Sequence, residues 1–106
     1  MTEVMASLGE LAALAGGICT PGADDLPVVG IGTDSRLDLG GHVFVAIEGD
    51  QFDGHEFLVE AMNSGAIAVL ISQGRQLPQG MPAIEVDDTR AALTRMATAW
   101  RQRMNE

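Results

Sequence analysis

Two clusters of reactive polar residues follow directly after short apolar runs in the first half of the chain. The run 28–31 is followed by Thr-Asp-Ser-Arg at 33–36, and the run 43–47 is followed by Asp-Gln-Phe-Asp-Gly-His at 50–55. Open α/β sheets bind their ligands just beyond the ends of strands. The sequence therefore predicts that the function of this chain is carried by these two clusters.

The first cluster, residues 33–36, combines two hydroxyls, a carboxylate and a guanidinium in one turn. Such a set can hydrogen-bond the edge of a nucleobase, with Arg36 set against a phosphate or against Asp34. The same residues are also typical of an Asx or Ser/Thr turn with a surface ion pair. Composition alone leaves these two interpretations open.

The second cluster places a glycine and a histidine at the start of a predicted helix. Backbone N–H groups at a helix start, beside a titratable imidazole, form a reasonable small anion site. Asp53 can equally cap the helix, with His55 on its first turn and no ligand bound. His42 is more typical of a structural or solvated residue. No spacing among His42, His55, Asp50 and Asp53 resembles a metal site, so none is predicted.

Motifs for catalysis are mostly missing. The chain has no G-x-x-x-x-G-K-[ST] loop for ATP and no lysine. Residues 30–32 supply only two glycines of a G-x-G-x-x-G fingerprint, which argues against a dinucleotide-binding fold. Ser35, His55 and Asp53 can be combined on paper into a triad, but no G-x-S-x-G motif supports one. We therefore expect no catalytic residue in this chain.

Length and charge narrow the class of protein further. At 106 residues, 46% of them hydrophobic, the chain is expected to fold as a single domain, 1–106. The net charge of -9 argues against nucleic acid and anionic membranes as partners. No apolar run approaches the ~20 residues that cross a bilayer, and a basic signal-peptide start is missing, so we expect a cytoplasmic protein. The single cysteine, Cys19, is expected to be a small, partly buried side chain.

Local patterns predict the elements that position the two clusters. Ser7 and Glu10 form the S-x-x-E capping box of a short helix that ends at 16–17. Strands are expected from residue 28 to 33 or 34, and over 43–47, 66–71 and 83–86. Helices are expected over 56–64 and from 87–89 to the end of the chain.

This order of elements predicts an α/β fold, with a small mixed or largely parallel sheet packed with helices. The last helix should bury an apolar stripe of Leu93, Met96, Ala97, Trp100 and Met104. Its remaining faces carry four of the six arginines of the chain. A long, arginine-rich terminal helix is also what the connection to a following domain would look like.

Five motifs follow one another along the chain: Thr-Asp-Ser-Arg at 33–36, Val-Phe-Val-Ala-Ile-Glu-Gly at 43–49, Phe-Asp-Gly-His at 52–55, Gly-Ala at 65–66, and Val-Asp-Asp-Thr-Arg at 86–90. In this order they resemble the N-terminal domain of the Mur ligases, over residues from about 7 to 103. Each motif alone is weak, but five in register are hard to obtain by chance. The order and gaps are most similar to the family member that adds D-alanyl-D-alanine to a UDP-N-acetylmuramoyl-tripeptide.

The resemblance implies that this domain holds the UDP end of a UDP-muramoyl-peptide. It implies that Ser35 and Arg36, with Asp34, meet the uridine, that Ala46 and Ile47 line the pocket, and that Gly49 and Phe52-Asp53-Gly54-His55 face the diphosphate or sugar. A central domain using ATP and Mg²⁺, and a third domain bringing the amino acid or dipeptide, would lie outside this chain.

Two alternatives stay open beside this interpretation. The same domain occurs in the diaminopimelate- or lysine-adding members of the family. The second alternative is a stand-alone, degenerate interaction module. It is kept open because Glu48 and Gln51 occupy positions where the family usually has basic residues. Losing two cations beside a diphosphate would remove roughly 1.5 to 3 kcal/mol apiece if both made direct contacts.

Overall fold

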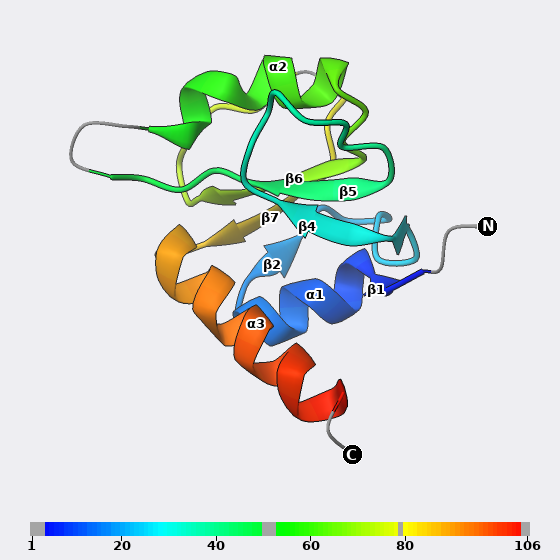
Figure 1. The fold of residues 1–106 in the computed structure, drawn as a ribbon. Coiled ribbons are helices and arrows are strands. Elements are labelled where there is room, and N and C mark those ends of the chain that lie inside the picture. The colour runs from blue at the N-terminus through cyan, green and yellow to red at the C-terminus, as the bar shows by residue number, and fades with distance from the viewer. Residues whose placement is uncertain (1–3, 50–52, 79, 105–106) are drawn as a thin grey trace.

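A five-stranded sheet forms the middle layer of the protein in a computed structural model that describes residues 4–49, 53–78 and 80–104 (Figure 1). The strand order is β2-β7-β6-β5-β4. The four parallel strands are β4 (Gly30–Gly32), β5 (His42–Val45), β6 (Ala68–Ser72) and β7 (Ala83–Val86). β2 (Ile18–Cys19) pairs with β7 in the antiparallel direction. The predicted α/β fold with a largely parallel sheet is therefore confirmed.

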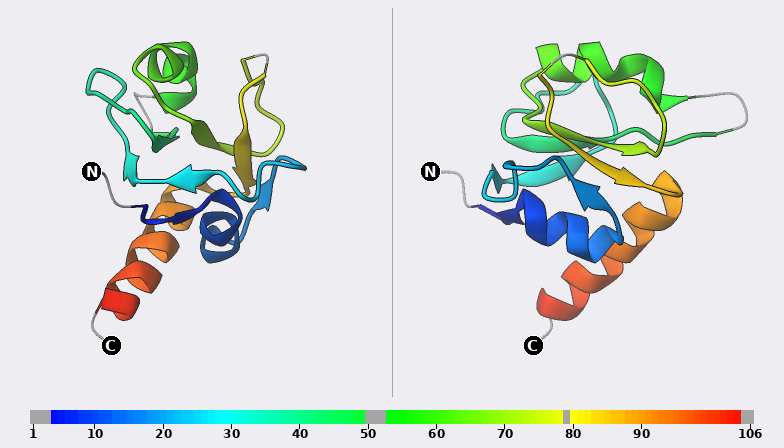
Figure 2. Two further views of the ribbon diagram at one scale, coloured as in Figure 1. Left: turned by 90° about the vertical axis from the view of Figure 1, so that its right-hand side faces the viewer. Right: turned by 180° about the vertical axis from the view of Figure 1, so that it is seen from behind.

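Helices cover both faces of this sheet (Figures 1 and 2). On one face lie α1 (Leu8–Ala15) and α3 (Thr89–Met104), which contact each other. On the other face a 3-10 turn, η1 (Gly54–Phe57), leads directly into α2 (Leu58–Asn63). The result is a three-layer arrangement whose two cores are separated by the sheet.

Alternation along the strands divides the apolar residues between these two cores. In β5, Val43 and Val45 belong to the core under α1 and α3, while Phe44 belongs to the core under η1 and α2. All five residues of β6 are buried, as expected of a central strand covered on both faces. The continuous apolar run at 66–71 was predicted to be a strand buried on both faces, and β6 confirms this prediction.

The local signals at the two ends of α1 are also confirmed. Ser7 Oγ accepts a hydrogen bond from the Glu10 amide at 3.2 Å, and Glu10 Oε1 accepts one from the Ser7 amide at 3.3 Å. Gly16 ends α1 in the left-handed region at φ 73°. The Arg95 guanidinium donates to the Ala15 carbonyl at 2.9 and 2.7 Å, which ties α3 to the end of α1.

Several boundaries differ from those predicted. The strand expected from residue 28 is two pieces, because β3 (Pro27–Val28) pairs with β1 (Ala6–Ser7) in a separate two-stranded sheet. The helix expected over 56–64 starts as the 3-10 turn η1 and becomes α-helical only at Leu58. Including Ala97 in the buried stripe of α3 was wrong: Ala97 is exposed, and Ala92 is buried against the sheet instead.

Candidate functional site

The two predicted clusters lie at the same edge of the sheet. Because β4 to β7 are parallel, their carboxyl ends point the same way. Residues 33–36 follow β4, residues 46–49 follow β5, Ser72 ends β6, and residues 87–89 follow β7. The expectation that polar groups gather beyond the strand ends therefore holds in space as well as in sequence.

The first cluster contains a local ion pair in an exposed turn. The Arg36 guanidinium donates to both oxygens of Asp34 at 3.0 Å, and the Arg36 amide donates to Asp34 Oδ1 at 2.9 Å. The hydrogen bond from the Arg36 side chain lowers the pKa of the Asp34 carboxyl to about 2. This is the Asx turn with a surface ion pair that the sequence left as one of two interpretations.

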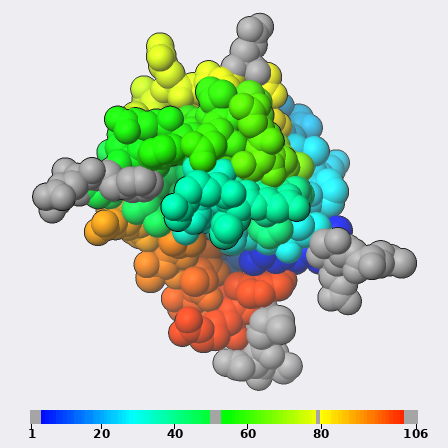
Figure 3. Space-filling view, turned by 45° about the horizontal axis from the view of Figure 1, so that its top comes forward, coloured from blue at the N-terminus to red at the C-terminus, as the bar shows by residue number. Residues whose placement is uncertain are grey.

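The same turn lines a cavity of about 560 Å³, which we call the Ser35 cavity. Its wall consists of residues 33–36 with Phe44, Phe57 and Glu60. Ser35 is buried, and its carbonyl accepts a hydrogen bond from Ser64 Oγ at 2.7 Å, which holds the turn against the end of α2. In the space-filling view of Figure 3, the teal surface of the segment between β4 and β5 lies beside the green surface of α2. Hydroxyls, a carboxylate and aromatic side chains around one cavity of this size suit a flat, polar heterocycle.

In the second cluster, Asp53 caps η1 and His55 is buried behind it. Asp53 Oδ1 accepts hydrogen bonds from the His55 amide at 2.9 Å and from His55 Nδ1 at 2.7 Å. His55 Nε2 accepts a hydrogen bond from the Ser72 amide at 3.0 Å. Because an amide N–H only donates, Nε2 is unprotonated and the ring proton sits on Nδ1. Both ring nitrogens are engaged within the protein, so His55 positions Asp53 and the end of β6.

Three further side chains, those of Glu48, Ser72 and Arg75, close this cluster into a ring. Arg75 Nη2 donates to Asp53 Oδ2, and Arg75 Nη1 lies 3.6 Å from Glu48 Oε2. Ser72 Oγ donates to Glu48 Oε1. We call Glu48, Asp53, His55, Ser72 and Arg75 the polar ring. The hydrogen bond from Arg75 is the main cause that lowers the pKa of the Asp53 carboxyl to about 2, with a further contribution from the His55 amide.

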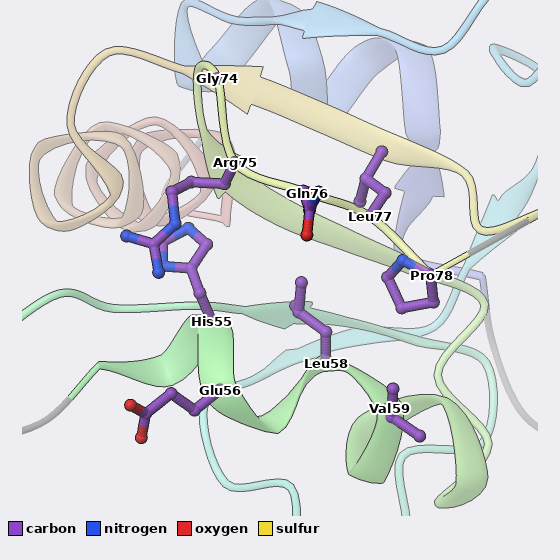
Figure 4. A pocket seen from close by; sticks show the side chains of 9 residues that line it. All are labelled: His55, Glu56, Leu58, Val59, Gly74, Arg75, Gln76, Leu77 and Pro78. Atoms are coloured by element: carbon purple, nitrogen blue, oxygen red, sulfur yellow. The ribbon is translucent and has the colours of Figure 1, made fainter.

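Arg75 also lines a second cavity, of about 510 Å³, between η1 and α2 on one side and the loop after β6 on the other. We call it the Arg75 cavity. Figure 4 shows Gln76 and Leu58 pointing toward one another from opposite walls, and the Arg75 side chain reaching toward His55. Sequence reasoning missed Ser72 and Arg75. Two features of the sequence could have identified them: Ser72 stands at the end of a buried strand, and Arg75 is one of only six cationic residues in the chain.

Gly54 has a packing reason to be glycine. A Cβ atom at this position would lie 2.8 Å from the Ile47 amide nitrogen and 2.9 Å from the Ala46 Cα, both of which are backbone atoms. No side chain fits into so close an approach of two backbone segments. Gly54 therefore lets η1 start directly against the end of β5.

The predicted site residues are only partly brought together. Gly49, Asp53, Gly54 and His55 surround the end of β5 or the start of η1, and Phe52 lies outside the described residues. Ala46 is fully buried and belongs to the core under α2, whereas Ile47 is half-buried. The Ser35 cavity and the Arg75 cavity share no lining residue, because η1 and α2 separate them.

Within the described ranges, no group of three or more His, Cys, Asp or Glu residues could hold a metal ion. No helix in the same ranges is both long and apolar enough to cross a membrane.

Known proteins match this chain in sequence and in fold. The family model described as "Mur ligase family, catalytic domain" matches residues 27–101, which include both clusters. The chain belongs to the Mur ligase family. The UDP-N-acetylmuramoyl-L-alanyl-D-glutamate--2,6-diaminopimelate ligase of Geobacter metallireducens is 37% identical to this Mur ligase domain over 75 residues, 71% of the domain and 15% of the relative.

A relative of another kind matches equally well. The UDP-N-acetylmuramoyl-tripeptide--D-alanyl-D-alanine ligase of Synechocystis sp. is 37% identical over 82 residues, 76% of the domain and 18% of the relative. The crystal structure of MurF from Acinetobacter baumannii superposes with a TM-score of 0.80 at 26% identity, covering 98% of the domain and 22% of that chain. The chain thus spans less than a fifth of the length of the Geobacter metallireducens and Synechocystis ligases.

Proposed function

We propose that this Mur ligase domain recognises the UDP end of UDP-N-acetylmuramoyl-tripeptide, for a ligase that adds D-alanyl-D-alanine. The observation that carries the proposal is the Ser35 cavity, which gathers the Thr-Asp-Ser-Arg turn at the carboxyl end of a parallel strand. Membership of the Mur ligase family supports it, as does the match to MurF over nearly the whole domain.

The uridine occupies the Ser35 cavity in this proposal. Thr33 and Ser35 supply hydroxyl and backbone groups for the polar edge of the uracil, and Phe57 supplies an apolar wall for its ring. The diphosphate and sugar run along the strand ends toward Gly49 and the Asp53–His55 turn. Backbone amides donate most of the hydrogen bonds to the diphosphate there, because the net charge of -9 disfavours a general attraction of phosphates.

The chemistry belongs to the other parts of the parent ligase. We expect a central domain to bind ATP and Mg²⁺ and to convert the peptide carboxylate to an acyl phosphate. A third domain presents D-alanyl-D-alanine, whose amine attacks that acyl phosphate. This domain holds the other end of the substrate, in the cytoplasm, and contributes no catalytic residue.

A diaminopimelate-adding ligase is the second candidate, favoured by the relative of that kind at the same 37% identity. A stand-alone interaction module is favoured by the acidic Glu48 at the end of β5. Sequencing the gene beyond codon 106 separates the module from both ligases. A G-K-[ST] loop in the same frame within a few dozen codons supports a ligase, and a stop codon supports the module.

Titration of the domain with UDP-N-acetylmuramoyl-tripeptide, followed by NMR, tests the proposed function. The amides of residues 33–36 and Phe57 should shift, and Ser35→Ala should weaken binding roughly threefold to tenfold through one lost hydrogen bond. Thr98→Ala, which removes an exposed hydroxyl from α3, is the matched control and should leave the affinity unchanged. Amides of 33–36 that stay unmoved at millimolar ligand would contradict the proposal.

A further inference from the structure

Positive charge is scarce at the strand-end edge. The chain has six arginines and no lysine. Arg36 is paired with Asp34, and Arg95 is bound to the Ala15 carbonyl behind the sheet. Arg75 stands at the second cluster, where it joins the polar ring and lines the Arg75 cavity. Arg90 lines a cavity with Glu48 and Ser72 beyond the end of β7. Arg75, which pairs with both Glu48 and Asp53, is the cation that lies within the second cluster.

The two acidic partners of Arg75 hold it unequally. Asp53 accepts a hydrogen bond from Nη2, whereas Glu48 lies 3.6 Å from Nη1, beyond hydrogen-bond length. A guanidinium carries five N–H donors, and the bond to Asp53 uses one of them. The Arg75 side chain is 36% exposed and that of Glu48 is 45% exposed, so solvent reaches the looser pair. Asp53 fixes the guanidinium, while Glu48 mainly balances its charge.

The charges of the polar ring disfavour an anion as long as Glu48 stays in place. Glu48 and Asp53 together carry two negative charges against the single positive charge of Arg75, and the unprotonated Nε2 makes His55 neutral. A phosphate that approached Arg75 would therefore meet a net negative cluster. Phosphate oxygens suit the fork of a guanidinium at least as well as a carboxylate does. Exchange of Glu48 for a phosphate oxygen would keep the donor satisfied.

We propose that Arg75 is the cation that this domain presents to the phosphates of its ligand, and that Glu48 is the counter-ion displaced on binding. The inference rests on the proposed function, because it takes the ligand to be a nucleoside diphosphate sugar. Ser72 Oγ, bonded to Glu48 Oε1, gives the displaced carboxylate a second partner, so that Glu48 is not left unpaired when its other oxygen moves away. Glu48 thus lowers the affinity of the free domain for phosphates.

Calorimetric titration of the 106-residue chain with UDP-N-acetylmuramoyl-tripeptide tests the inference through effects of opposite sign. Arg75→Gln should raise the Kd roughly tenfold to a hundredfold, because a charge-assisted contact is lost. Glu48→Gln should lower the Kd about threefold to tenfold, because the competing carboxylate is gone. Arg75→Lys keeps a cation without the planar fork and should fall between Arg75→Gln and the unmodified chain.

Matched variants separate these effects from the change in net charge. Arg101→Gln removes an exposed cation from the far end of α3, and Asp25→Asn removes an exposed carboxylate from the loop before β3. Both should change the Kd less than twofold. If Glu48→Gln weakens binding as Arg75→Gln does, Glu48 supports the site and the inference is wrong. The inference is also wrong if the NMR spectrum shows that Arg75→Gln is folded and this variant binds as tightly as the unmodified chain.

A titration with inorganic pyrophosphate keeps the two proposals distinguishable. If the muramoyl ligand does not bind at all, the proposed function fails. The Arg75 side-chain signals should still shift with pyrophosphate, and at lower concentration in Glu48→Gln. Absence of that shift overturns the inference whatever the muramoyl ligand does.

Discussion

The two strand-end clusters contain the same kind of ion pair, built in different ways. Asp34 and Arg36 are two residues apart in one turn, and the Arg36 side chain is 82% exposed. Asp53 and Arg75 are 22 residues apart and join the start of η1 to the loop after β6. In both pairs the arginine lowers the pKa of the carboxyl to about 2.

An equal pKa therefore does not mean an equal structural role. In the first pair the Arg36 side chain competes with water on nearly every side, and exposed pairs of this kind contribute little to stability. The second pair is continuous with the buried His55 ring and the Ser72 amide, so losing it disturbs contacts between separate elements. The Asp34–Arg36 pair can therefore break without disturbing contacts between separate elements, whereas most of the second cluster is committed to holding the fold.

Gly54→Ala should give the largest effect and tests whether the second cluster is the rigid one. The new Cβ would clash with backbone atoms of Ala46 and Ile47, so we expect a loss of roughly 1–3 kcal/mol in the free energy of unfolding. Gly40→Ala is the control beside the first cluster, because its Cβ would meet only the Asp38 carboxylate, at 3.3 Å. Urea denaturation of both variants makes the measurement, and equal midpoints would remove the proposed difference in rigidity.

His55→Leu should be next in size. The substitution leaves the buried Ser72 amide without its acceptor, which costs roughly 1–3 kcal/mol, while the side-chain volume is nearly kept. His42→Leu, which loses one hydrogen bond to the Gly40 carbonyl in an exposed position, is the control and should cost less. Hydrogen exchange of the Ser72 amide should accelerate only in His55→Leu. Unchanged protection there would show that the His55 ring does not hold β6.

Local signals explain which parts of this fold were predictable from the sequence. The capping box of Ser7 and Glu10 and the strand β7 at 83–86 were predicted correctly, because each has a sequence pattern that is visible within a few neighbouring residues. The strands β1 and β2 were missed. Each has two residues, too few to show a period, and β2 exists only through its pairing with β7, 65 or more residues away.

The candidate site likewise contains features that local sequence patterns predict and features that depend on contacts between distant residues. The Asx turn of Asp34 and the cap of Asp53 follow from residue type and position, and both were among the interpretations that the sequence allowed. Ser72 and Arg75 reach their partners across 17 to 24 residues, which no local pattern encodes. The separation of the two clusters into two cavities depends on where η1 and α2 lie, and this is a property of packing.

Removing the two carboxylate charges should give the smallest effects, and their pH dependence sharpens the comparison. Asp53→Asn keeps a capping oxygen but loses the ion pair, so we expect a loss of about 1 kcal/mol at pH 7, and a smaller loss for Asp34→Asn, whose ion pair is exposed. Both carboxyl pKa values are lower in the folded state than the ordinary 3.8. Their contribution to stability is therefore fully present above pH 3.8 and is lost as the pH falls toward about 2.

Urea denaturation of the unmodified chain and both variants at several pH values between 7 and 2 measures this difference. The gap between Asp53→Asn and the unmodified chain should close across pH 4 to 2, and Asp34→Asn should stay close to the unmodified chain throughout. A loss from Asp34→Asn as large as that from Asp53→Asn would mean that the turn 33–36 also holds the fold. In that case a change in the conformation of the turn on binding a uridine would break the Asp34–Arg36 pair at a cost in folding stability.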